Sequence, residues 1–437
     1  MVLVEINIII GGIVMKKLSI LLLILALVLT MFTACDQSNE PTGVTTTAPT
    51  TKTADDTNNL KGKKVVVARW GGNDAETTAF AKMLEEFTAE TGIIAEEKVY
   101  TDYDTQLKAD LIAGSAPDVF YVDANMAPFY IDQGVLSEID RAAVEADKFY
   151  DSLTIPFEKD GKLYAVSKDF STLALYYNKK WVSENEIPAT QEELYGEDFF
   201  NKIKKKLPEG VAVLTYNQDL ARLLDLLEID GTEIVKDGNM SNLGSPAVIN
   251  NLKTVFDAAA AKRILTPGDL GMGWNGEAFG NERTALMIEG NWVYGTLKQE
   301  FSDVDFGIVE VPTYKGKKTT MVFTVGYAIG KDTKEPKAAL EFVKFATGPK
   351  GMKTWCSGAG VLPSRGDVAA SMGVDKDPFL APHIAGANYA KSWQKGDSLS
   401  IINREFQNYF NSAVKGEMTL EEVMKKAEEE ANKQIAR

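Results

Sequence analysis

The stretch KKVVVARWGG, residues 63–72, leads from β-branched residues into two glycines, and DAETTAFAKMLEEFTAETG follows at residues 74–92. The apolar residues between Phe80 and Phe87 recur at helical spacing, so they predict one buried face of a helix. IIAEEKVY, residues 93–100, then favours a second strand. Strand, turn, helix and strand in this order predict a parallel sheet that is covered by helices.

The same alternation continues along the chain. Strands are expected in PDVFYVD (117–123) and GVAVLTYN (210–217), and extended segments in YAVSKDFSTLALYYNKKW (164–181). Helices are expected at residues 103–114, 126–134, 245–265, 335–351 and 418–437. In the last of these, Thr419 and Glu422 have the spacing of a capping box. The fold class is therefore α/β.

An export signal is expected before this body. Lys16 and Lys17 precede the apolar run 18–32, and the order Phe-Thr-Ala before Cys35 resembles a bacterial lipobox. Residues 1–34 are thus interpreted as a signal peptide, with cleavage before Cys35 and a lipid on its sulfur. The alternative is an uncleaved membrane helix, for which the apolar run is short against the about 20 residues that a bilayer needs.

Two further expectations concern the same end of the chain. Met15 is the expected true start, because Glu5 precedes the apolar core and no basic residue occurs before Lys16. Residues 35–59 are rich in Thr, Pro, Asp and Asn, so they are expected to form a disordered tether. Such a tether reaches about 25 to 30 Å.

Composition excludes several function classes. The 437 residues carry a net charge of −15, which disfavours binding to nucleic acid or to anionic lipid. His383 is the only histidine, and Cys356 is the only thiol besides Cys35. Clustered His/Cys metal sites and Cys–His catalysis need partners that are scarce here, so we expect no metal, no cofactor and no disulfide in the body.

Several segments, in this order, resemble family 1 extracellular solute-binding proteins of ABC importers, the maltose-binding-protein type. They are ETTAFAKMLEEFTAETGI (76–93), LIAGSAPDVFYVDANMAPFYIDQGVLSEID (111–140), YAVSKDFSTLALYYNKKW (164–181), TALMIEGNW (284–292), VLPSR (361–365) and NSAVKGEMTLEEVMKKAEEEANKQI (411–435). The resemblance implies a periplasmic-binding-protein type II fold, in which two α/β lobes joined by a multi-strand hinge hold the ligand in the cleft between them. It also implies a monomer that binds a sugar and meets ABC permease subunits, at the outer face of the membrane.

By this resemblance the backbone crosses from one lobe to the other three times. Lobe one would comprise residues 60–167 and 327–372, and lobe two residues 168–326 and 373–437. A ligand that touches both lobes stabilises the closed state only by binding it more tightly than the open one.

Sugar sites need aromatic platforms and planar polar groups, and the chain offers candidates of both kinds. The aromatic candidates are Trp70, Trp274 and Trp292, each of which has core packing as its alternative role. The polar candidates, taken from strand ends and from the resemblance, are Asn73, Asp74, Asp123, Asn125, Asp169, Asn217, Asp219 and Arg365. For Asp74 the alternative is a helix cap, and for Arg365 a surface charge.

Three other functions stay open at this point. A lipoprotein glycosidase could work with two carboxylates and without histidine, and the chain has 62 acidic residues. A polyamine-binding protein would suit an acidic, aromatic cleft. A passive adhesin or peptide-binding lipoprotein would need neither chemistry nor a closing cleft.

Overall fold

This computed structural model describes residues 57–72, 74–236, 239–393, 396 and 398–436. The expected signal peptide, the lipidated Cys35 and most of the expected tether lie outside the described residues. At the end of the tether, Thr57–Leu60 form a short 3-10 turn (η1), and Leu60 packs against the core. Leu60 is thus a partly buried residue at the start of the described part of the chain.

The first group of strands follows the expected alternation. Its elements are β1 (Lys64–Trp70), α2 (Asp74–Thr91), β2 (Ile94–Tyr100), α3 (Tyr103–Ala113), β3 (Val119–Asp123) and α4 (Ala127–Asp132). β1 pairs in parallel with β2 on one side and with β3 on the other. The predicted apolar face of α2 is buried from Phe80 to Phe87, which confirms the strand–helix–strand interpretation.

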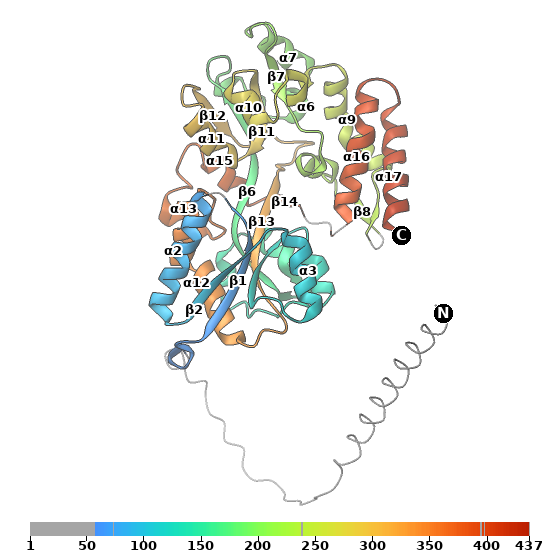
Figure 1. The fold of residues 1–437 in the computed structure, drawn as a ribbon. Helices are drawn as coiled ribbons and strands as arrows, with labels where there is room; N and C mark the ends of the chain where they lie inside the picture. The colour runs from blue at the N-terminus through green and yellow to red at the C-terminus, as the bar shows by residue number, and fades with distance from the viewer. Residues whose placement is uncertain (1–56, 73, 237–238, 394–395, 397, 437) are drawn as a thin grey trace, which may run out of the picture. The chain divides into compact units, whose positions relative to one another are not determined.

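Two long strands connect this group with a second one. β6 (Ala165–Asn178) is a single continuous strand that pairs antiparallel with β13 (Met321–Ile329), and β13 also pairs antiparallel with β3. Towards its other end β6 pairs with β11 (Thr284–Gly290) and β12 (Phe306–Val309). Both strands run between the lower and upper groups of elements in Figure 1.

The second group is also built on parallel pairs. β7 (Ala212–Thr215) lies between β10 (Ile264–Leu265) and β11 and is parallel to both. The strand order across the whole mixed sheet is β10-β7-β11-β6-β13-β3-β1-β2. β14 (Lys391–Ser392) pairs with β13, and two small ribbons are formed by β4 (Glu158–Lys159) with β5 (Lys162–Leu163) and by β8 (Val235–Lys236) with β9 (Met240–Ser241).

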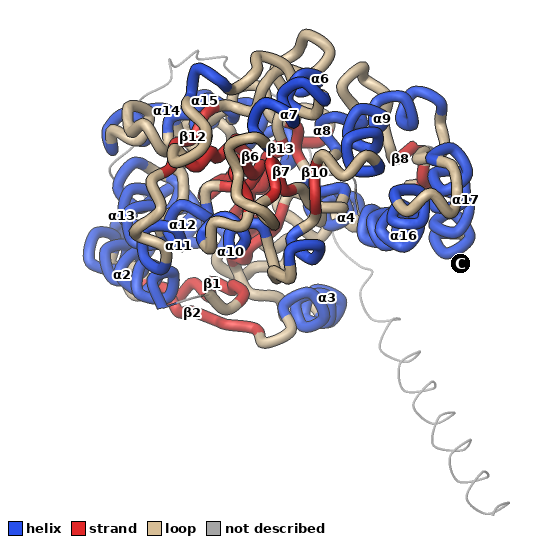
Figure 2. The backbone as a smooth tube through the Cα atoms, turned by 90° about the horizontal axis from the view of Figure 1, so that it is seen from above, coloured by secondary structure: helices blue, strands red, loops and turns tan. Residues whose placement is uncertain are grey.

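Helices surround the strands, as Figure 2 shows from above. The longer ones are α9 (Pro246–Ala260), α12 (Pro336–Thr347), α13 (Pro349–Ala359), α16 (Ser398–Val414) and α17 (Leu420–Ile435). The shorter ones are α5 (Asp151–Thr154), α6 (Gln191–Leu194), α7 (Glu197–Lys204), α8 (Leu224–Leu227), α10 (Asn275–Gly280), α11 (Trp292–Glu300), α14 (Gly366–Met372) and α15 (Ala381–Gly386). The expected capping box is present at the start of α17.

Two large hydrophobic clusters lie under these helices. One draws on residues 65–166 and 327–368, where α2, α12 and α13 pack on one another and on the first group of strands. The other draws on residues 173–321 and 399–431, where α16 and α17 pack on each other and on α9. Cys356 is buried in the first cluster, as expected of a small packed side chain. The lobe boundaries themselves stay a prediction.

Within the described ranges, no helix combines the length and the apolar character needed to cross a membrane.

Candidate binding site

The predicted binding residues follow the carboxyl ends of strands in both groups. Trp70 ends β1 and Asp123 ends β3, whereas Asn217 and Trp292 each come two residues after the ends of β7 and β11. Within each group the two strands are parallel, so their carboxyl ends share an edge. Open α/β sheets bind ligands at such edges.

One long strand, β6, connects the two edges. Asp123 and Asp169 lie in the same row of the sheet, because Val325 of β13 pairs with both. Leu173 lies four residues further along β6 and pairs with Gly290 at the end of β11. Four residues of strand span about 13 Å. The two groups of predicted residues are thus connected by a single strand, at a separation suited to an extended small molecule.

Asp169 is enclosed by the protein. Its carboxylate forms an ion pair with Lys168 and accepts a hydrogen bond of 2.7 Å from the indole Nε1 of Trp355. The ammonium group of Lys168 lies 4.3 Å from the centroid of the Trp355 ring and 4.8 Å from that of Tyr121. The charge of Asp169 is therefore balanced within the fold, and its contact with a ligand stays a prediction.

Of the other candidates of the first group, Asn125 keeps a buried polar atom without a partner in the described part of the chain, whereas Asp123 and Trp70 are held by their neighbours. Asp123 Oδ1 accepts a 2.8 Å hydrogen bond from a backbone N–H, while burial raises the pKa of this carboxyl. The amide oxygen of Asn125 is buried and has no hydrogen-bond donor among the described residues. Trp70 is held edge-on by the rings of Tyr103 and Tyr121, at 5.2 and 5.0 Å between centroids. Asn73 lies outside the described residues.

In the second group, Asn217 meets two charged residues that the sequence did not single out. Its amide nitrogen lies 3.3 Å from Oε2 of Glu289, a buried carboxylate on β11. Arg222 donates to the other oxygen of Glu289 at 2.9 Å. The available signal was the glutamate itself, which interrupts the otherwise apolar strand TALMIEG. Nothing in the sequence pointed to its partner.

Trp292 and Trp274 present indole surface to solvent, with 37% and 36% of each residue exposed. Trp292 begins α11, and its ring packs edge-on against Phe323 at 5.7 Å. Trp274 precedes α10, and its ring lies over Gly276, where a β-carbon would collide with it. Large exposed aromatic faces of this kind suit stacking on a sugar ring.

Two acceptors next to these elements also lack donors in the part of the chain that the structure describes. They are Oδ1 of Asp219, in the loop after β7, and Oδ1 of Asn291, which directly precedes Trp292. Burial raises the pKa of Asp219, and the nearby charge of Arg222 opposes that rise. Buried acceptors without donors are uncommon in folded proteins, so they are good candidates for hydrogen bonds from a ligand.

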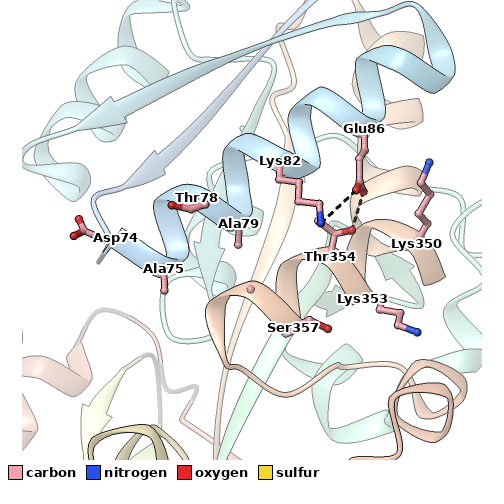
Figure 3. Close-up of a pocket in the computed structure, with 11 residues that line it drawn as sticks. Asp74, Ala75, Thr78, Ala79, Lys82, Glu86, Lys350, Lys353, Thr354 and Ser357 are labelled. Atoms are coloured by element: carbon pink, nitrogen blue, oxygen red, sulfur yellow. Dashed lines mark hydrogen bonds and ion pairs between the residues drawn. The ribbon is translucent and has the colours of Figure 1, made fainter. Parts of the chain in front are cut away.

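Two predicted residues lie apart from these groups. Arg365 is buried, and its guanidinium donates to Asp367 at 2.8 Å and to Glu145 at 3.0 Å, which favours a structural role over a ligand contact. Asp74 is the first residue of α2, where a carboxylate stabilises the helix dipole. Figure 3 shows it at one end of a groove between α2 and α13 that holds none of the other predicted residues.

A family model described as bacterial extracellular solute-binding protein matches residues 78–382. The chain belongs to this family. The matched range of this solute-binding protein includes β6, β7, β11 and β13, which carry the candidate site.

Two relatives of this solute-binding protein are themselves named as binding proteins. The galactooligosaccharide-binding protein of Bacillus subtilis (strain 168) is 26% identical over 276 residues, which cover 59% of this chain and 62% of that protein. The maltotriose-binding protein of Pyrococcus abyssi (strain GE5 / Orsay) is 24% identical over 377 residues, covering 82% of this chain and 80% of that protein.

The fold is shared with a solved structure of a cyclo/maltodextrin-binding protein complexed with maltotetraose. The TM-score is 0.74 at 20% identity, with 85% of this chain and 97% of that chain covered. This likeness confirms the predicted mixed α/β fold of the maltose-binding-protein type.

Proposed function

We propose that this solute-binding protein captures a neutral sugar or short oligosaccharide between two lobes and delivers it, unaltered, to an ABC importer. The ligand would lie along β6, between the strand ends that carry Trp70 and Asp123 and those that carry Asn217 and Trp292. Closure of the lobes would bring both sets of side chains onto it.

The observation that carries the choice of a neutral ligand is the pairing of the buried carboxylates. Asp169 forms an ion pair with Lys168, and Glu289 forms one with Arg222, whereas Asp123 and Asp219 have no ion pair among the described residues. A polyamine site needs carboxylates that are free to pair with the ligand, because burying a cation without a partner is costly. The carboxylates of Asp169 and Glu289 are therefore not free to pair with a polyamine, which supports a hydroxylated ligand.

The remaining polar atoms fit hydroxyl groups. Asn125, Asp219 and Asn291 each hold a buried oxygen without a donor among the residues described, and a sugar hydroxyl can donate to each. The exposed ring of Trp292 offers the apolar surface on which a sugar face can stack.

Anchoring completes the proposal. Cys35 would carry a lipid that holds the protein at the outer face of the cytoplasmic membrane, and the Thr-rich segment behind it would act as the tether. Delivery to permease subunits, with the protein as a monomer, is part of the same proposal.

Calorimetric titration of the purified body with maltotriose, maltotetraose, a galacto-oligosaccharide mixture and spermidine tests the proposal. Binding of a sugar, with no release of reducing ends after prolonged incubation, is the expected result. Binding of spermidine and of no sugar would identify a polyamine as the ligand. Release of reducing ends would identify the protein as a glycosidase.

A further inference from the structure

Arg222 lies over the ring of Trp292, the indole on which the proposed sugar would stack. Its guanidinium carbon is 5.1 Å from the centroid of the Trp292 ring and 5.4 Å from that of Phe323. A guanidinium within about 6 Å of an aromatic face is attracted by the π electrons. The Arg222 side chain is largely buried, with 20% exposed, so this cation is part of the packed site rather than a mobile surface charge.

Glu289 holds this guanidinium in place. Arg222 donates to its Oε1 through NH2 at 2.9 Å and through Nε at 3.3 Å. Asn217 donates to the second oxygen of the same carboxylate at 3.3 Å. Arg222 Nε also donates to Oε2 at 3.4 Å, so the guanidinium contacts both carboxylate oxygens and its plane is fixed, which a lysine ammonium cannot do.

The backbone and β13 hold the indole from other directions. A β-carbon at Gly290 would collide with the ring of Trp292, so the ring rests directly on the strand end. Phe323 meets the ring edge-on at 5.7 Å and belongs to β13, the strand shared by both groups. With Arg222 on one face, 37% of Trp292 is still exposed.

We propose that Arg222 is a specificity-determining residue, which fixes the Trp292 ring for sugar stacking and keeps cationic ligands off the exposed part of that ring. The proposal rests on the proposed function, because it explains how the same site accepts a neutral ligand and rejects a polyamine.

The physical reason is the short distance through the ring. A cation stacked on the exposed part of the ring would lie within about 10 Å of the guanidinium, which is comparable to the screening length at physiological ionic strength. The site is partly buried, so this repulsion is screened less than at an open surface. A neutral sugar ring carries no net charge and does not meet this repulsion.

A test without ligand uses charged quenchers of tryptophan emission. The Trp292 component is the difference between the wild type and Trp292→Phe, measured with caesium and with iodide. In Arg222→Gln we expect at least a twofold rise in caesium quenching of this component and a fall in iodide quenching. Equal quenching in Arg222→Gln and the wild type overturns the inference.

Two further variants test whether the change in quenching comes from the charge of Arg222, rather than from Glu289 or from the loss of any cation–π contact. Arg222→Gln combined with Glu289→Gln removes both charges, and the rise in caesium quenching should persist in part. If the double variant shows no rise in caesium quenching, the rise in Arg222→Gln comes from an unpaired Glu289, and the inference is overturned. Lys180→Gln is the matched control, since Lys180 lies 5.2 Å from the Trp181 ring and pairs with Glu282 at 2.7 Å. It should leave the Trp292 component unchanged.

Ligand titrations test the selectivity itself. With maltotetraose and spermidine as probes, Arg222→Gln should lose at least tenfold in maltotetraose affinity and gain measurable spermidine binding. Arg222→Lys should continue to reject spermidine while losing part of the sugar affinity, a split that simple misfolding would not produce. Rejection of spermidine by Arg222→Gln overturns the inference. A wild type that binds no sugar refutes the proposed function instead, and the quenching result then decides on Arg222 independently.

Discussion

Replacing Asp225 by asparagine should change how the stability of the fold depends on pH. Asp225 is buried on α8, and burial raises the pKa of its carboxyl from 3.8 to about 7. His383 is buried on α15, and burial lowers the pKa of its imidazole from 6.5 to about 4. Between pH 4 and 6.5 the folded state therefore binds more protons than the unfolded chain at Asp225, and fewer at His383.

The two contributions oppose each other. Stability rises with pH where the unfolded chain binds more protons, so His383 contributes stability that is lost as pH falls from 6.5 to 4. Asp225 contributes stability that is complete below pH 3.8 and is lost as pH rises towards 7. Each slope is about 1.4 kcal/mol per pH unit, so each contribution amounts to about 3 kcal/mol over this window.

Of the two contributions, only that of His383 remains in Asp225→Asn. Relative to the wild type, the free energy of unfolding should rise by about 3 kcal/mol between pH 4 and 6.5, measured by urea denaturation at fixed pH values. His383→Gln should show the opposite slope, and the double variant should return to the slope of the wild type. Parallel curves for Asp225→Asn and the wild type would refute the reasoning.

Three further changes have defined outcomes. Trp292→Ala should weaken sugar binding more than about tenfold, or about 1.4 kcal/mol, in calorimetry, whereas Ile112→Ala, at an exposed site on α3, should not. Unaltered affinity would remove Trp292 from the site. Gly290→Ala should lower the free energy of unfolding by about 1 to 3 kcal/mol, because the new β-carbon collides with the Trp292 ring; unchanged urea curves would contradict that contact. Cys35→Ser should abolish the lipid mass on the mature protein in mass spectrometry, and a lipidated variant would disprove the anchor.

The fold was predictable because its signals are local. The helical spacing between Phe80 and Phe87, the strand before Trp70 and the capping box at Thr419 each lie within a few residues of chain, and the structure confirms all three. The continuity of β6 was less visible, since a run of extended residues does not reveal which strands it will pair with.

The site was only partly predictable, because its electrostatics depend on distant partners. The strand-end positions of Asp123 and Trp292 follow from sequence order. The pairing of Arg222 with Glu289 joins residues 67 positions apart, and the bond from Trp355 to Asp169 spans 186 positions. For Arg365 the alternative of a surface charge does not fit its burial, because its partner Glu145 lies 220 positions away in the sequence; its contact with a ligand stays a prediction.

The place of β13 in the sheet affects how the chain can be made. β13 fills the gap between β3 and β6, yet it is the strand at residues 321–329. During synthesis the edge of β3 stays unpaired until about two hundred further residues have been added. Contacts of such long sequence separation form slowly. In a nascent chain of this protein, the edge of β3 should therefore remain unpaired until β13 has been synthesised.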